Sequence, residues 1–129
     1  IGDKKFGSIL NKGEKLNFVC PANSAIYKVD SITSNKHIKG LKFYCQDIKT
    51  GKDVQVIDSS NNKVDGFIFG KEPTEEDKTY YFKSVKCNSV KDGDNDNKYY
   101  PTFISNVSGE YTDKYVKNLG FNKCSYYSY

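Results

Sequence analysis

The stretch AIYKVDSITSNKHIKGLKFYC, residues 25–45, sets the expectation for the fold. Its two ends, residues 25–29 and 38–45, are rich in β-branched and aromatic residues, which favour strands. The polar residues between them are typical of a turn. The pattern therefore predicts an antiparallel β-hairpin. Helical periodicity is scarce in this stretch and elsewhere along the chain, so we expect an all-β protein.

Similar short runs recur along the whole chain, separated by turns rich in Gly, Asn, Asp and Lys. A chain of 129 residues with 15% aromatic residues is large enough for one hydrophobic core. We therefore expect a single β domain over residues 1–129. The predicted strands span residues 16–20, 25–29, 38–45, 54–58, 63–69, 79–87, 99–107, 115–121 and 124–129.

The hairpin pattern recurs in three copies, at residues 26–43, 54–69 and 104–121. Each copy is a strand and a polar turn, then a β-branched residue, two polar or small residues, and an apolar residue with Phe two positions later. The spacing is uneven, because the interval from Phe69 to Phe121 is twice the interval from Phe43 to Phe69. The pattern predicts one hairpin unit used three times. Unrelated hairpins of an antiparallel sandwich are the alternative.

Four cysteines, Cys20, Cys45, Cys87 and Cys124, indicate the compartment. They form no C-x-x-C pair and the chain has a single His, which argues against a zinc site. An even number in a small chain predicts two disulfides and an oxidising environment. No stretch approaches the ~20 apolar residues that a membrane span requires. We therefore expect a secreted, extracellular protein whose signal peptide has been removed.

The charged residues argue against nucleic acid as a partner. The chain carries 20 Lys+Arg against 16 Asp+Glu, a net charge of +4, and every one of the basic residues is Lys. Base-specific readout usually relies on the bidentate guanidinium of Arg. A mild positive charge with interspersed signs is typical of an ordinary soluble surface.

His37 is the only imidazole, and we expect no enzymatic activity. No G-x-S-x-G motif accompanies it, so a nucleophile with a base is not indicated. Ribonuclease chemistry usually needs two acid–base groups and a cation for the phosphate. One His without any Arg supplies these poorly.

Two segments resemble known proteins. The segment 103–121 is similar to the last repeat of jacalin-related lectins, in which a strand leads to a G-x-x-x-D loop and then to an apolar-Gly-aromatic strand. The matching residues are Gly109, Asp113 and Leu119-Gly120-Phe121. The segment 20–45 resembles vitelline membrane outer layer protein I, through Cys20-Pro21 and the strand that ends at Cys45. Together they cover 45 of the 129 residues.

The resemblance implies a β-prism, in which three antiparallel sheets surround a pseudo-threefold axis, here stapled by two disulfides. It also implies a sugar site formed by Gly109, Tyr111 and Asp113. There a carboxylate accepts hydrogen bonds from vicinal hydroxyls, and Tyr stacks on the apolar face of the sugar. The expected partner is an extracellular carbohydrate or a cell-surface protein. A plain hairpin turn is the alternative reading of residues 109–113.

The protein is expected to need no cofactor, with one alternative. Asp92, Asp94 and Asp96 stand at alternate positions of a polar run, a spacing that lets a loop wrap Ca²⁺ with oxygen ligands. The positions where an EF-hand loop needs Gly and Glu hold Asn97 and Phe103, so the run is not an EF-hand. A flexible, solvated turn is the other reading.

A second function class is a small secreted effector with a ribonuclease-like fold that lacks catalysis and acts on a host protein or RNA. Such proteins often begin near an aromatic-x-Cys, as Phe18-Val19-Cys20 does here. They also need a helix soon after the first Cys. That helix would span residues 24–34, which are rich in Ile, Val and Thr and therefore form helix poorly.

The four cysteines allow three pairings, and the two hypotheses differ in the one they favour. The repeated-hairpin hypothesis favours Cys20–Cys45 with Cys87–Cys124, since each bond then staples one hairpin unit. The effector hypothesis favours Cys20–Cys124 with Cys45–Cys87.

Overall fold

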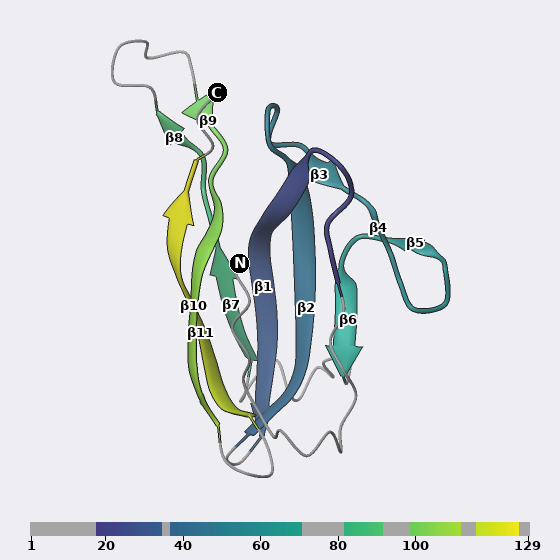
Figure 1. The fold of residues 1–129 in the computed structure, drawn as a ribbon, viewed down its shortest axis with the longest axis vertical. Helices are drawn as coiled ribbons and strands as arrows, with labels where there is room; N and C mark the ends of the chain where they lie inside the picture. Colours follow the sequence, from purple (N-terminus) through teal and green to yellow (C-terminus); the bar gives the residue numbers. More distant parts are fainter. Residues whose placement is uncertain (1–17, 35–36, 71–81, 92–98, 112–115, 127–129) are drawn as a thin grey trace.

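The structure, a computed structural model, describes residues 18–34, 37–70, 82–91, 99–111 and 116–126. All the regular secondary structure of these residues is antiparallel β, and they contain no helix (Figure 1). The expectation of an all-β antiparallel protein is therefore confirmed for this part of the chain. None of its elements is a helix long and apolar enough to cross a membrane.

A five-stranded sheet forms the larger layer. Its strands run in the order β3 (Asp53–Val54), β2 (His37–Asp47), β1 (Ser24–Ser34) and β7 (Phe82–Lys86), and β6 (Phe67–Gly70) also pairs with β2. The other described strands form three pairs: β10 (Phe103–Tyr111) with β11 (Val116–Ser125), β4 (Val56–Ile57) with β5 (Lys63–Val64), and β8 (Val90–Lys91) with β9 (Tyr99–Tyr100).

The β10–β11 hairpin packs against the sheet, with β10 beside β1 and β11 beside β2. Alternate residues of these strands point into the space between the two layers. The buried core there consists of Tyr27, Val29, Leu41, Phe43, Cys87, Phe103, Ile104, Val107 and Phe121. Full burial of one such aliphatic or aromatic side chain contributes roughly 1.5–3 kcal/mol, so this core accounts for the association of the two layers.

The β1–β2 and β10–β11 hairpins are equivalent in register over residues 29–33 of β1 and 107–111 of β10. Val29 pairs with Phe43 in the first hairpin, and Val107 pairs with Phe121 in the second. The interval in sequence from Val29 to Val107 equals the interval from Phe43 to Phe121. Two irregularities in the pairing also correspond: the shifts between residues 26 and 28 and between 32 and 33 recur at 104 and 106 and at 110 and 111. A further shift between Asn106 and Val107 has no counterpart in the first hairpin. The first and third predicted copies of the hairpin unit are therefore confirmed as hairpins.

The second predicted copy, residues 54–69, pairs differently. Its short strands β4 and β5 pair with each other, whereas β6 leaves this pair and joins β2, with Phe67 opposite Phe43. The described strands therefore show two equivalent hairpins, and a three-fold arrangement is not confirmed by them.

The observed strand boundaries correct several predictions. Residues 18–20 form no strand. Cys20 is joined to β2 by its disulfide with Cys45, and the next residue, Pro21, has no backbone amide to donate to a strand partner. The predicted strands 54–58 and 63–69 are each broken in two. By contrast, the two predicted strands 115–121 and 124–129 join in β11, since Cys124 still pairs with Ile104.

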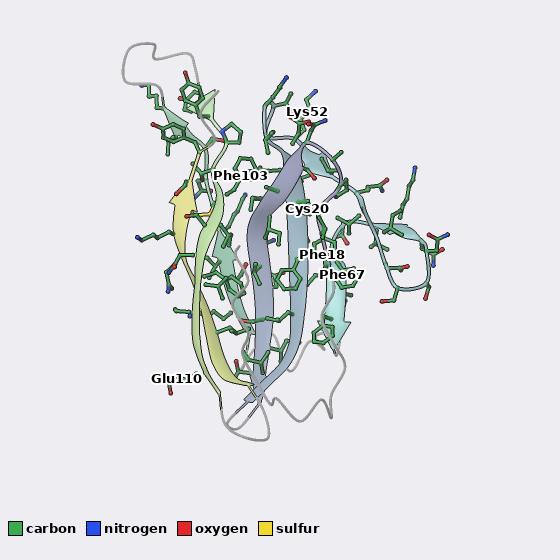
Figure 2. The ribbon with its side chains drawn as sticks, viewed as in Figure 1. Phe18, Cys20, Lys52, Phe67, Phe103 and Glu110 are labelled. Carbon is green, nitrogen blue, oxygen red and sulfur yellow. A yellow bond between two sulfur atoms is a disulfide. The ribbon has the colours of Figure 1, made fainter. Side chains whose placement is uncertain are left out.

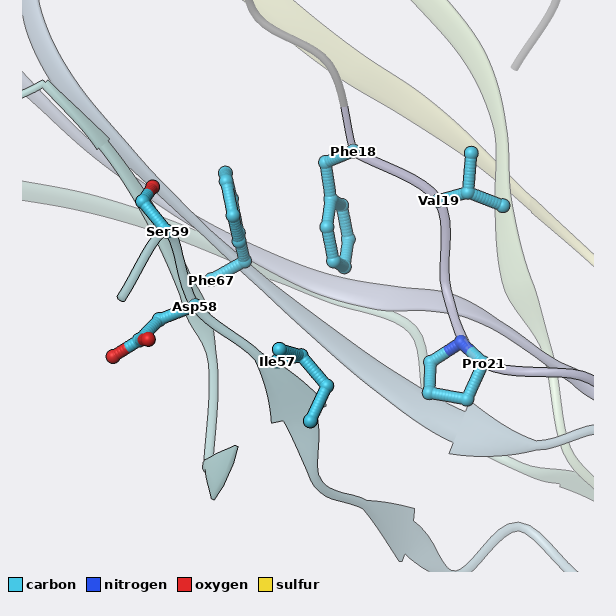
Figure 3. Close-up of a pocket in the computed structure, with 7 residues that line it drawn as sticks. All are labelled: Phe18, Val19, Pro21, Ile57, Asp58, Ser59 and Phe67. Carbon is cyan, nitrogen blue, oxygen red and sulfur yellow. The ribbon is translucent and has the colours of Figure 1, made fainter. Parts of the chain in front are cut away.

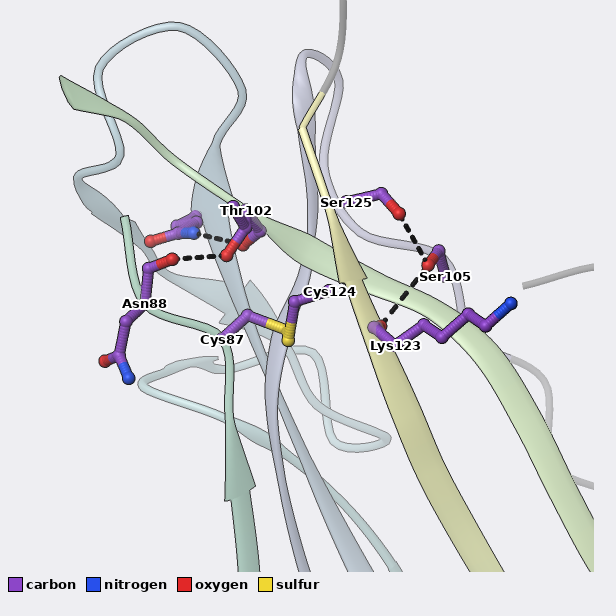
Figure 4. The surroundings of a disulfide bond; sticks show 8 residues. Cys87, Asn88, Thr102, Ser105, Lys123, Cys124 and Ser125 are labelled. Atoms are coloured by element: carbon purple, nitrogen blue, oxygen red, sulfur yellow. Dashed lines mark hydrogen bonds between the residues drawn. A yellow bond between two sulfur atoms is a disulfide. The ribbon is translucent and has the colours of Figure 1, made fainter. Parts of the chain in front are cut away.

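The disulfides are Cys20–Cys45 and Cys87–Cys124. This is the pairing that the repeated-hairpin hypothesis favours, and it differs from the pairing of the effector hypothesis. Figure 4 shows how the second bond ties the segment after β7 to β11. Sequence separations of 25 and 37 residues correspond to about 3–4 kcal/mol of loop-closure entropy for each bond. Two disulfides are consistent with an extracellular protein.

Candidate functional site

A groove of about 460 Å³ opens beside β6, between the segment that precedes β1 and the turn between β4 and β5 (Figure 3). Its volume falls within the range of small-ligand sites, roughly 300–1,000 Å³. Apolar side chains predominate in its lining, and two polar residues join them. The lining residues are Phe18, Val19, Pro21, Ile57, Asp58, Ser59 and Phe67.

Stacked phenyl rings form the wall of the groove. Phe18 stacks on Phe67 with 4.6 Å between ring centroids, and on its other neighbour, Phe43, at 5.9 Å. Phe43 belongs to the buried core, so the wall continues inward to the packing between the layers. The Cys20–Cys45 bond holds Phe18 close to β2, and Figure 2 shows Phe18 and Phe67 next to each other. The local sequence and this disulfide therefore preorganise the wall.

The polar rim of the groove is a turn capped by Asp58. The Asp58 carboxylate oxygen Oδ1 accepts hydrogen bonds from the amides of Ser60 and Asn62, at 2.9 and 2.8 Å. Asn61 adopts a positive φ of 67° inside this turn, which Asn tolerates better than most residues. In Figure 3, Asp58 and Ser59 lie on the far side of the Phe67 ring from Phe18. The rim thus offers a carboxylate and a hydroxyl beside an aromatic wall.

Apolar surface around the groove is open to water. Val19 is 83% exposed and Ile57 is 47% exposed. Both residues line the groove. The groove can therefore bury apolar surface of a ligand while its rim accepts hydrogen bonds.

A polar cluster covers the face of the main sheet that points away from the core. The Asp30 carboxylate accepts hydrogen bonds from the hydroxyls of Tyr44, at 3.0 Å, and Ser84, at 2.6 Å. The ammonium groups of Lys28 and Lys42 lie 4.6 and 5.1 Å from the centre of the Tyr44 ring. Burial and the nearby negative charge of Asp30 raise the pKa of Tyr44 above its ordinary value. Both oxygens of Asp30 are engaged, so this cluster stabilises the sheet.

A second aromatic cluster lies near the Cys87–Cys124 bond. Tyr100 stacks on Tyr126 with 5.9 Å between ring centroids, and Tyr99 and Tyr126 are each 59% exposed. Thr102 anchors this end, because its hydroxyl donates to the carbonyl of Asn88 (Figure 4). The cluster presents neutral aromatic rings to water.

The predicted sugar residues lie at the end of the β10–β11 hairpin. Gly109 is within β10 and pairs with Leu119, and Tyr111 is the last residue of β10 and pairs with Val116. Asp113 lies outside the described residues. Figure 1 shows that this end of the hairpin is also the end where β1 runs toward β2. Gly109 does not line the groove.

The predicted calcium residues Asp92, Asp94 and Asp96 also lie outside the described residues. Within the described ranges, no three His, Cys, Asp or Glu side chains are grouped so that they could hold a metal ion. His37 begins β2, and its backbone pairs with Ser34.

The groove was missed by the sequence analysis because its residues come from three separate segments. Phe18 and Ile57 belong to runs that the pattern predicts as strands, and neither run by itself indicates a ligand. The sequence carries one signal, at Phe67. This residue occupies the position in the second copy of the pattern that Leu41 occupies in the first copy. Leu41 is buried in the core, whereas Phe67 lines the groove.

The chain matches no protein-family model, no curated protein and no solved structure to which it was compared.

Proposed function

We propose that the chain is a secreted, non-enzymatic binding protein of the lectin type, which recognises an extracellular glycan or a glycoprotein surface. One observation carries the proposal. The segment 103–121, which resembles a lectin repeat, contains the antiparallel strands β10 and β11, and two paired strands are what the resemblance implies there. Gly109 and Tyr111 stand on the strand that leads into its turn.

A β-prism-like architecture is part of this proposal. The equivalence of the two long hairpins supports it, because tandem units of one type build such a fold. The interval in sequence between these hairpins is three times the interval from Phe43 to Phe69. The spacing of the three copies in sequence is therefore a multiple of one interval, although the second copy pairs differently.

The chemistry of the proposed sugar site follows from its residue types. The Asp113 carboxylate would accept hydrogen bonds from two adjacent hydroxyls, which a charged acceptor binds more strongly than a neutral one does. The Tyr111 ring would cover the apolar face of the sugar. Backbone amides that flank them would donate to ring or hydroxyl oxygens.

A glycan array tests the proposal with wild type and two variants. Asp113→Ala removes the proposed carboxylate, and Asn35→Ala is the matched control, since Asn35 holds the sequence position of the first hairpin unit that corresponds to Asp113. We expect wild type and Asn35→Ala to bind the same glycans and Asp113→Ala to lose them. Arms with Ca²⁺ and with a chelator test whether Asp92, Asp94 and Asp96 contribute. No binding by wild type would refute the lectin proposal.

Two observations weigh against the effector alternative. Residues 24–34, which that hypothesis needs as a helix, form strand β1. Cys20 pairs with Cys45 and not with Cys124. The binding-protein proposal needs neither of those features, and we therefore prefer it.

A further inference from the structure

We propose that the groove beside β6 is a second saccharide site, and that it takes a pyranose ring without negative charge, either neutral or amino-bearing. This inference rests on the proposed lectin function and adds a second place of contact and a ligand class. The groove is formed by described residues that lie apart from Gly109 and Tyr111.

The wall of the groove fits the apolar face of a pyranose. One face of such a ring presents C–H groups, which stack favourably on aromatic and aliphatic surfaces. Phe67 and Phe18 supply a stacked aromatic pair, and Ile57 and Pro21 face it across the groove (Figure 3). The exposed portions of Ile57 and Val19 lose contact with water when a ring enters.

The rim of the groove supplies an oriented acceptor. Two backbone amides hold Oδ1 of Asp58, and no described residue donates a hydrogen bond to its Oδ2. The carboxylate is therefore fixed in direction while one oxygen stays available to a ligand. Hydroxyls or an ammonium group can donate to it, and Ser59 also lines the groove.

The charge of the lining determines which sugars fit. Among the described residues that line the groove, Asp58 is the one with a charged side chain, and none is Lys. A sialic acid, a uronic acid or a sulfated sugar would bring a second negative charge close to Asp58, and like charges repel. We expect such sugars to bind at least about tenfold more weakly than neutral ones.

A purely apolar ligand fits the groove less well. It would cover the Asp58 carboxylate without supplying a hydrogen-bond donor, and burial of an unpaired charged group is costly. A ligand with an apolar face and a hydroxylated edge satisfies both the wall and the rim. This combination is characteristic of a pyranose.

The test is a set of binding titrations by saturation-transfer NMR and calorimetry on the full chain, with cellobiose, chitobiose and sialyllactose as probes. Asp58→Asn is the central variant, because the amide oxygen of Asn can still accept the two backbone hydrogen bonds that form the turn. Asp47→Asn is its matched control. Asp47 caps a similar turn, accepting hydrogen bonds from the amides of Lys49 and Thr50, away from the groove.

The apolar wall is tested separately. Ile57→Ala and Val19→Ser remove exposed apolar surface and leave the core intact, since both side chains are largely in water. Val90→Ala, at a residue 42% exposed on β8, is the matched control.

We expect wild type to bind a neutral probe and to bind sialyllactose more weakly. Asp58→Asn should weaken binding of the neutral probe about tenfold, the scale of one hydrogen bond to a charged acceptor. It should also reduce the ratio between the affinities for the neutral probe and for sialyllactose. Both control variants should bind as wild type does. If the groove variants also bind like wild type, the inference is overturned while the lectin function stands. If wild type binds no saccharide in these titrations or on the array, the lectin function itself is overturned.

Discussion

Phe43 on β2 and Phe121 on β11 meet edge to face, with ring centroids 6.4 Å apart and ring planes at 82°. The two residues occupy the same position in the two equivalent hairpins. Both rings belong to the buried core, so this contact joins the five-stranded sheet to the β10–β11 hairpin.

The first prediction concerns this contact. Phe121 is 8% exposed in the core, and Phe121→Ala would leave a cavity between the layers. We expect a loss of about 3–5 kcal/mol in the free energy of unfolding, measured by urea denaturation with the disulfides intact. Asn122→Ala, at an exposed residue next to it in β11, is the control. A loss below about 1 kcal/mol for Phe121→Ala would contradict the packing described above.

The second prediction concerns the disulfides. Digestion without reductant, followed by mass spectrometry, should yield peptides that join Cys20 to Cys45 and Cys87 to Cys124. The double substitution Cys87→Ser and Cys124→Ser should lower the free energy of unfolding by about 2–5 kcal/mol, because it frees β11 from the segment after β7. A peptide that joins Cys20 to Cys124 would be inconsistent with this fold.

The third prediction concerns alkaline pH. Burial, and then the hydrogen bond to Asp53, raise the pKa of Tyr27 from 10.0 to about 12. A raised pKa means that the folded state holds the phenolic proton more tightly than the unfolded state does. The resulting stability is fully present below pH 10 and is lost as the pH rises through about 12.

Phenolate absorbance measures this titration directly, since the chain has 11 Tyr and no Trp. We expect one fewer late-titrating phenol in Tyr27→Phe than in wild type. If all the tyrosines of wild type titrate together near their ordinary pKa, the environment assigned to Tyr27 is wrong.

Much of the strand content was predictable because strand signals are local. Residues 25–29 and 38–45 carry β-branched and aromatic side chains around a polar turn, and they lie within β1 and β2. The same holds for residues 104–107 and 116–121 in β10 and β11. In each hairpin the two strands are neighbours in sequence, and a short connection favours pairing between such strands.

Of the two candidate sites, one could be predicted from the sequence and the other could not. The G-x-x-x-D segment around Gly109 could be found from sequence, since its residues are contiguous. The groove could not, because Phe18, Ile57 and Phe67 become neighbours only when a disulfide and a strand pairing bring their segments together.

The sequence by itself determined that the chain forms antiparallel hairpins, because strand and turn signals are local. It also determined that the four cysteines form two disulfides, because their number is even. Only the tertiary structure decided where the second copy of the pattern goes. There β6 pairs with β2 and places Phe67 opposite Phe43. The physical reason is that a short strand has several possible partners, and the choice among them depends on side chains from distant segments that pack on its face.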